Sequence, residues 1–369
     1  MQIRVLASTK AGYEMPKEEA VNFSGKSAGI CYLPDSLDTL FSEDPAKTER
    51  RAKGTLASGH HSVFGHVTYN LALEGIPKIL AMILNNEKIY NTSEKSARYT
   101  KMEPSEKEKV LYEKWIEIYQ KEIQKHYPNI DDKRSKKLAQ ENARYLISVF
   151  TPATIMEYTV SFGQLNYIAH WFENFVKNAE DTKFNAKLKK VFIEFNDKIS
   201  DLIIPELNSD VKGRTFSLFA PRARKEEFGE NYCINYEGTF AQLAQAQRHR
   251  TTYCEISFMN KSEFFVPSII KGTELENEWI KDISSLEDEF PQGLLLKINE
   301  RGTVENFIMK CQERLCGAAQ LEIAIQTKEN LNKYINAVKE NGNEEMVNKV
   351  YSDAKKYFKY KFTNDTKQM

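Results

Sequence analysis

The sequence lacks most of the features that assign a function directly. Its longest apolar run, Ile79 to Leu84, is far shorter than the about 20 residues of a membrane-spanning helix. Lys plus Arg and Asp plus Glu both number 52, so no net charge attracts a nucleic acid or an anionic membrane. A glycine-rich phosphate loop, a G-x-S-x-G segment and a catalytic carboxylate pair are absent, which leaves hydrolase and Rossmann interpretations unsupported. An anionic ligand must therefore be bound by local charges.

The cysteines give no sign of a disulfide framework. They are odd in number and widely spread: Cys31, Cys233, Cys254, Cys311 and Cys316. The last two are not spaced as C-x-x-C, which favours buried, unreactive thiols over a redox pair. Because no signal segment precedes them, we expect a reduced cytoplasmic protein that is neither exported nor anchored.

Composition and periodicity predict a folded protein that mixes helices and strands. The chain has 369 residues, of which 41% are hydrophobic and 28% charged, enough for about two domains. Apolar residues at three- and four-residue steps predict amphipathic helices from Pro104 to about Tyr127, from Leu188 to Ile199 and from Leu331 to Val338. Runs rich in β-branched and aromatic residues predict strands, Ala153–Val160 and Leu294–Ile298. We expect an α/β (α+β) fold.

The order of these segments indicates a tandem duplication. In each half a proline introduces a strand, then a helical segment and a long amphipathic helix follow. Upstream, Leu73-Glu74-Gly75 before an apolar helix matches Tyr236-Glu237-Gly238 before another, which we expect to reach Arg248. We predict two repeats, 1–207 and 208–369, each a small sheet packed with long helices. A chance similarity in order is the alternative, because few residues are identical.

Two polar clusters are candidates for binding an anion. In Gln245–Arg250, two guanidiniums and an imidazole are close enough to grip a phosphate, although a basic helix end that caps its own carbonyls has the same composition. In Glu94–Tyr99, a serine, backbone N–H groups and Arg98 suit a phosphate monoester, although an exposed loop is the simpler interpretation. Local chemistry alone leaves both pairs of alternatives open.

A third cluster concentrates histidines without forming a credible metal site. The segment His60–His66 holds three of the six histidines. No carboxylate or cysteine accompanies them at ligand spacing, so we predict no metal.

Taken together, the clusters resemble the flavin-dependent thymidylate synthases. That family carries an H-x-x-x-F-E-H segment, an R-H-R, an E-x-S-x-R-Y, an A-R-x-x-L-P and an R-x-x-x-x-x-Q-x-E-I helix. The first half of this chain supplies His60–His66, Glu94–Tyr99 and Ala143-Arg144. The second half supplies Gln245, Arg248-His249-Arg250, and Arg314 with Gln320, Glu322 and Ile323. The joint presence of these motifs is far more specific than any single one.

The departures from the family pattern are complementary between the halves. Where R-H-R is expected, the first half has Asn85, Asn86, Glu87 and Lys88. Where E-x-S-x-R-Y is expected, the second half has Glu255–Asn260, which lacks the arginine. Gly65 replaces the family's glutamate and Ala318 a common histidine, so flavin geometry or affinity is expected to differ. We interpret the chain as a pseudo-dimer that keeps one composite site.

The resemblance implies a role for each retained residue. The phosphate and sugar of dUMP would be held by residues of the first repeat, Glu94, Ser96, Ala97, Arg98 and Arg144. Gln245 and Arg248 would touch the nucleotide, and Arg314 would be the catalytic residue beside the uracil. FAD would be held by Ser62, Arg248, His249 and Arg250.

The activity that the resemblance implies is methylation of dUMP to dTMP, with methylenetetrahydrofolate as carbon donor and NADPH as reductant. Because the family is tetrameric, a fused duplication would form a homodimer. A related pyrimidine C5 transferase with another nucleotide or a hydroxymethyl product, and a non-catalytic nucleotide-binding relative, are the alternatives. Nucleic-acid binding through Arg248-His249-Arg250 is disfavoured, because no basic, aromatic-interleaved surface surrounds these residues.

Overall fold

The computed structural model describes residues 15–32, 37–95, 104–208, 217–220, 224–315 and 319–355. The chain forms two compact units, each drawn from separate stretches of sequence. The first comprises Met1–Glu74, Glu87–Glu94 and Ile155–Phe216, and the second Gly75–Asn86, Lys95–Thr154 and Ser217–Met369. Within the described ranges, no helix is both long enough and apolar enough to cross a bilayer.

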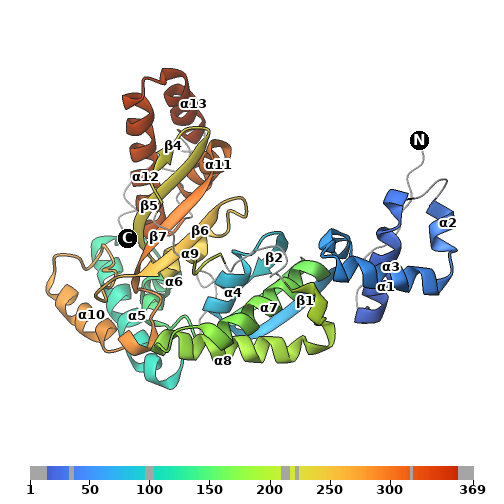
Figure 1. The fold of residues 1–369 in the computed structure, drawn as a ribbon. Coiled ribbons are helices and arrows are strands. Elements are labelled where there is room, and N and C mark those ends of the chain that lie inside the picture. Colours follow the sequence, from blue (N-terminus) through green and yellow to red (C-terminus); the bar gives the residue numbers. More distant parts are fainter. Residues whose placement is uncertain are drawn as a thin grey trace. The chain divides into compact units, whose positions relative to one another are not determined.

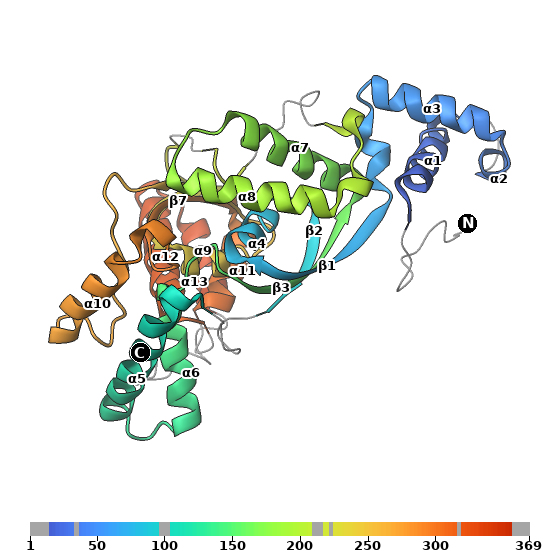
Figure 2. The same cartoon turned by 90° about the horizontal axis from the view of Figure 1, so that it is seen from below.

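The first unit is built around most of a three-stranded sheet. Its strands lie in the order β1 (Thr68–Pro77), β3 (Pro152–Ser161), β2 (Tyr90–Glu94), and β2 is antiparallel to β3. Helices α7 (Phe162–Asn178) and α8 (Lys183–Lys198) follow β3, pack on each other and run along the sheet (Figure 2). The predicted strand at Ala153–Val160 is therefore confirmed, as is the helix through Leu188.

The N-terminal part of the first unit is helical. It contains α1 (Lys17–Ser27), α2 (Leu37–Phe41) and α3 (Pro45–Ala57). Helix α1 packs closely on α3 at Gly25, where an added Cβ would lie 2.8 Å from the Cβ of Ala52. A side chain at this glycine would separate the two helices. The strand-like segment Ile3–Leu6 lies outside the described residues.

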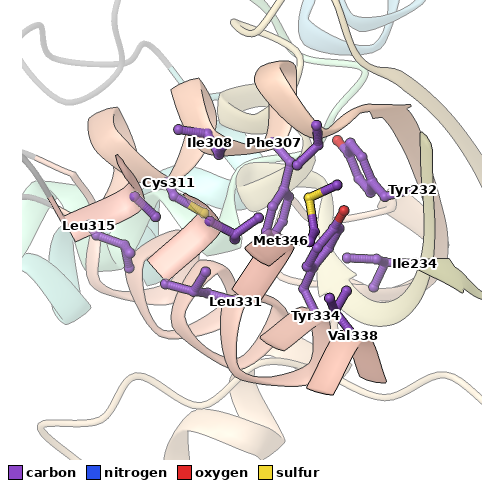
Figure 3. Close-up of a cluster of buried hydrophobic side chains, with 13 residues drawn as sticks. Tyr232, Ile234, Phe307, Ile308, Cys311, Leu315, Leu331, Tyr334, Val338 and Met346 are labelled. Atoms are coloured by element: carbon purple, nitrogen blue, oxygen red, sulfur yellow. The ribbon is translucent and has the colours of Figure 1, made fainter. Parts of the chain in front are cut away.

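The second unit contains a four-stranded antiparallel sheet. The strand order is β4 (Glu227–Phe228), β5 (Asn231–Thr239), β7 (Leu295–Thr303), β6 (Tyr253–Phe258). Helices α11 (Val304–Arg314), α12 (Leu321–Glu340) and α13 (Glu344–Lys355) pack together beside it (Figure 1). Figure 3 shows the buried core that joins them, in which Tyr232 and Ile234 of β5 meet Phe307 of α11 and Tyr334 of α12.

The two sheets share a common chain path. The order β1-β3-β2 is repeated as β5-β7-β6. A short helix of seven residues follows the first strand in both, α4 (Lys78–Leu84) after β1 and α9 (Phe240–Ala246) after β5. The backbone N–H of Ile79 donates to Val149 O at 2.9 Å, and that of Ala241 donates to Gln292 O at 3.1 Å. Each short helix is thus tied to the segment that precedes the last strand of its own sheet in chain order, β3 or β7.

Those two preceding segments pair with each other inside the second unit. Ser148 and Pro291 form an antiparallel bridge. On either side of it, Val149 N donates to Phe290 O at 3.0 Å, and Gln292 N donates to Ile147 O at 2.9 Å. The segments that precede β3 and β7 therefore form a short antiparallel pair.

Three further helices complete the second unit. Helix α5 (Glu106–His126) lies beside α6 (Asp132–Ala143) (Figure 2), and the ring of Trp115 on α5 meets Trp279 of α10 (Glu274–Ser284) edge-on at 4.9 Å. The helix predicted from Pro104 begins at Glu106, because Ser105 forms a capping box with Glu108. The helix predicted to reach Arg248 ends earlier, at Ala246, where the chain enters a tight turn.

We expect the aromatic core of the second unit to contribute strongly to its stability. Phe307 is fully buried, and its ring stacks on Tyr334 with centroids 5.1 Å apart. Phe307→Ala should lower the free energy of unfolding by about 3–5 kcal/mol, because it removes these contacts and leaves a cavity. Urea denaturation followed by circular dichroism measures this loss. Met309→Ala is the control, since Met309 lies on the same helix and is 38% exposed; equal losses in the two variants would contradict the assignment.

Candidate functional site

In the turn after α9, two side chains of R-H-R face solvent and the third faces the interior. Thr239 caps the helix by accepting from Gln242 N at 3.0 Å. After Ala246 the chain tightens, and the N–H of His249 donates to Ala246 O at 3.0 Å. Arg248 and Arg250 are exposed on this turn, whereas the side chain of His249 is buried and only 2% exposed. The two guanidiniums and the imidazole therefore face different surroundings.

Arg314, the last residue of α11, is bonded to that imidazole. Its Nε donates to Nε2 of His249 at 2.9 Å. Burial, together with the positive charges of Arg314 and Lys310, lowers the pKa of His249 to about 2. His249 is therefore neutral at physiological pH, and its ring proton resides on Nδ1 because Nε2 accepts.

In a second cluster, residues from both halves of the sequence bind the side-chain amide of Gln320. Arg144 begins a short 3-10 helix at the end of α6, and its Nη2 donates to Oε1 of Gln320. Nε2 of Gln245 donates to the same oxygen. Arg144 is 5% exposed and Gln245 8% exposed. Among the described residues, Nε of Arg144 and Oε1 of Gln245 have no hydrogen-bond partner.

Gln320 is held in place by a buried chain of hydrogen bonds. Its Nε2 donates to the hydroxyl of Tyr145 at 2.5 Å, and that hydroxyl donates to Oε2 of Glu322 at 2.7 Å. Thr239, the cap of α9, donates to Glu322 from its Oγ1 at 2.9 Å and from its N–H at 3.1 Å. Although these donors favour the carboxylate, burial raises the pKa of Glu322. The start of α12 is thereby fixed to α9 and to the end of α6.

Not every residue that the sequence singles out belongs to these clusters. Ser62 is exposed in the 3-10 helix His61–Gly65, and Glu94 is the last residue of β2; both lie in the first unit. Ser96, Ala97 and Arg98 lie outside the described residues, as do Cys316 and Ala318. The structure brings Arg144 to Gln245, and Arg314 to His249, all within the second unit.

The sequence analysis missed a fully buried charge pair. Lys310 and Glu300 are 0% and 1% exposed, and Nζ lies 2.5 Å from Oε2. Tyr232 and Tyr236 donate their hydroxyls to the same carboxylate at 2.9 and 2.8 Å. A lysine on the core side of an amphipathic helix is the signal that could have revealed the pair, because such a position is otherwise apolar.

Cys311, the residue after Lys310, is buried, as its spacing from Cys316 indicated. Cys311 is fully buried, and burial raises the pKa of its thiol to about 12. The predicted burial of this thiol is confirmed, and its lack of reactivity stays a prediction.

Comparison with known proteins connects the first part of the chain to a family. Residues 16–165 match the family described as thymidylate synthase complementing protein, Thy1. Over this segment, which is less than half of the chain, the sequence is similar to that family. The segment includes His60–His66, Glu94–Tyr99 and Arg144, whereas Gln245 and the residues of R-H-R lie beyond it.

The solved structures that are similar to part of this chain include a flavin-dependent thymidylate synthase. The crystal structure of the flavin dependent thymidylate synthase ThyX from Helicobacter pylori, complexed with FAD and dUMP, shares 15% identity with this chain. The match covers 50% of this chain and 96% of that chain, with a TM-score of 0.31. A search of curated proteins finds no match.

The buried neutral histidine predicts a pH-dependent stability. Below about pH 6.5 the unfolded chain protonates His249, whereas the folded protein does not do so until about pH 2. The unfolded state then binds more protons, so the free energy of unfolding falls as the pH falls. Between pH 7 and pH 5 the wild type should lose about 2 kcal/mol more than His249→Gln. Urea denaturation at both pH values measures the difference, and parallel pH profiles would rule out a buried neutral ring.

Proposed function

We propose that the chain is an FAD-dependent thymidylate synthase that methylates dUMP to dTMP, with methylenetetrahydrofolate as carbon donor and NADPH as reductant. The family match over residues 16–165 supports this reaction class. The observation that carries the proposal is Arg144, a buried guanidinium that shares one amide with Gln245. The charge of Glu322 acts on Arg144, but among the described residues Arg144 forms no ion pair and its Nε has no hydrogen-bond partner. The first sequence half thus supplies a cation to residues of the second.

A buried cation of this kind is suited to an anionic ligand. Removing a guanidinium from water is costly unless charge or hydrogen bonds compensate it. In the described part of the chain, Arg144 makes one hydrogen bond, to Gln320, and its Nε lacks an acceptor. A nucleotide phosphate offers several charged acceptors that match the fork of an arginine. We assign Arg144, together with Ser96, Ala97 and Arg98, to the dUMP phosphate, and Gln245 to the nucleotide beside it.

Arg314 is the residue we assign to the chemistry. Its guanidinium is 9% exposed at the end of α11 and is bonded through Nε to neutral His249. A cation beside the carbonyl of a pyrimidine stabilises negative charge that develops on the base when C5 acts as nucleophile. The weakly hydrated, planar guanidinium keeps its charge at any relevant pH, which suits it to this role.

The surroundings of Arg314 also suit a dinucleotide cofactor. Arg248 and Arg250 are both exposed on the turn that carries His249, so two cations lie where an anionic diphosphate can reach them. We propose that these two arginines hold the diphosphate of FAD. When bound, FAD supplies the hydride and mediates the transfer of the methylene group. The assignments of Ser62 to FAD and of Glu94 to the sugar remain predictions from the resemblance.

We further propose that the chain is a tandem duplication with a single composite site. The shared strand order of the two sheets supports the duplication. At the first-half position of R-H-R, the amide of Asn86 is 1% exposed; it donates to Cys254 O at 2.9 Å and accepts from Cys254 N at 3.3 Å. The amide of Asn86 is neutral and is already bonded to the backbone, so we expect one nucleotide to bind per chain. Two chains would then form a homodimer equivalent to the family tetramer.

We expect Arg144→Met to weaken dUMP binding selectively. Isothermal titration should give one dUMP per wild-type chain, with the affinity lowered about 30-fold, or about 2 kcal/mol, in the variant. Deoxyuridine, which lacks the phosphate, should bind both proteins equally weakly. An equal loss for both ligands would instead assign Arg144 to the base, and binding of two dUMP per chain would contradict the single site.

Turnover tests the function itself. FAD added to the purified protein should give a flavin absorbance band that shifts with dUMP, and the product should have the mass of dTMP. Arg314→Ala should keep the FAD band but lose about 100- to 1,000-fold in kcat, the usual effect of removing one donor to a developing negative charge. A product heavier by one oxygen would identify a hydroxymethyl transferase. Absence of any flavin binding would leave only a nucleotide-binding relative.

A further inference from the structure

We infer that His249 is a positioning residue, which holds the guanidinium of Arg314 in the orientation needed for the reaction and does not bind the flavin. The inference rests on the proposed function for the catalytic use of Arg314. The role of the imidazole is inferred from the contacts that His249 makes within this chain. The resemblance alone gives all of R-H-R to the cofactor, so the separation of His249 from Arg248 and Arg250 is new.

The bond between the two side chains fixes a direction. Nε of Arg314 donates to Nε2 of His249 at 2.9 Å, and the two side chains are 9% and 2% exposed. Because the guanidinium is planar and rigid, a bond at Nε determines where its two terminal nitrogens point. Loss of that bond would remove the restraint on Nε and allow side-chain torsions that the bond now excludes. Such loss of orientation lowers the rate of a step that needs an aligned donor.

Hydrogen bonds from Thr252 hold the backbone of the turn that carries His249. The carbonyl of His249 accepts from Thr252 twice, from its N–H at 3.1 Å and from its Oγ1 at 3.0 Å. Thr252 is 1% exposed, so water does not compete for these bonds. The imidazole therefore projects inward from a fixed backbone, toward α11.

The bond also requires an imidazole that stays neutral, and the surrounding charges favour that state. Nε2 can accept from Arg314 only while it carries no proton. The charged groups that act on the ring are Arg314 and, one helical turn earlier, Lys310. The Nζ of Lys310 lies 2.5 Å from Oε2 of Glu300, and this ion pair holds the ammonium group on the buried side of α11. Two cations on one side of a buried ring disfavour an imidazolium.

Two substitutions separate positioning from flavin binding. His249→Phe keeps a ring but offers Arg314 no acceptor. His249→Gln keeps a polar atom near the position of Nε2 and can accept from Arg314 Nε. The readout that needs no activity is the exchange of the Arg314 Nε–H proton with solvent, followed by NMR and assigned from the signal lost in Arg314→Lys. His61→Phe is the matched control for this readout, because His61 is another buried histidine, 3% exposed, in the first unit.

We expect the Nε–H proton to be protected in wild type, His61→Phe and His249→Gln, and to exchange at least 10-fold faster in His249→Phe. In turnover, His249→Phe should lower kcat about 10- to 100-fold while the KM for dUMP and the affinity for FAD change less than threefold. His249→Gln should recover most of the rate.

Two outcomes would overturn the inference. Unchanged Nε–H protection in His249→Phe would show that the imidazole does not hold Arg314. A loss of FAD affinity in both His249 variants, with kcat restored at saturating FAD, would assign the residue to the cofactor. If wild type forms no dTMP yet protection is lost in His249→Phe alone, the proposed function fails while the positioning of Arg314 stands.

Discussion

The structure of the second unit depends on how its buried positive charges are compensated. Two of its buried cations have different partners. Lys310 is fully neutralised by Glu300, which two tyrosine hydroxyls also bind. Arg144 makes one hydrogen bond to a neutral amide, and its Nε lacks an acceptor in the described part of the chain. A neutralised pair stabilises a core position, whereas a buried cation without an ion pair is costly unless nearby negative charge compensates it. The charge of Glu322 acts on Arg144 without a direct ion pair, and this is why we propose that Arg144 binds an anionic ligand.

The fold brings this cation to its neighbours through backbone pairing between distant segments. The bridge of Ser148 with Pro291 lies just after Arg144 in one half and just before β7 in the other. Glu322 then joins Thr239 at the start of α9 to Tyr145 beside Arg144. These bonds fix the ends of α6, α9 and α12 relative to one another. Rigid support of this kind is what a binding site needs to hold its donors at a set distance.

The conversion of an R-H-R motif into two exposed arginines and one buried histidine follows from local geometry. A tight turn sends alternate side chains to opposite sides, so Arg248 and Arg250 face solvent while His249 faces α11. An imidazole tolerates burial next to cations because it can remain neutral, which a guanidinium cannot do. Residue type and turn geometry therefore agree on which of the three points inward.

The sequence by itself indicated three of the long helices, two of the strands and the identity of the polar clusters. Apolar periodicity placed α5 to within two residues and located α8 and α12, although α12 begins ten residues before the predicted Leu331, because amphipathic patterns report which face is buried. The motif order also led to the family that residues 16–165 match. Only the tertiary structure decided that Arg144 meets Gln245 on Gln320, that His249 turns toward Arg314, and that Lys310 is paired with Glu300. Local sequence periodicity says which residues are buried, whereas the partner of a buried polar group is chosen by long-range packing.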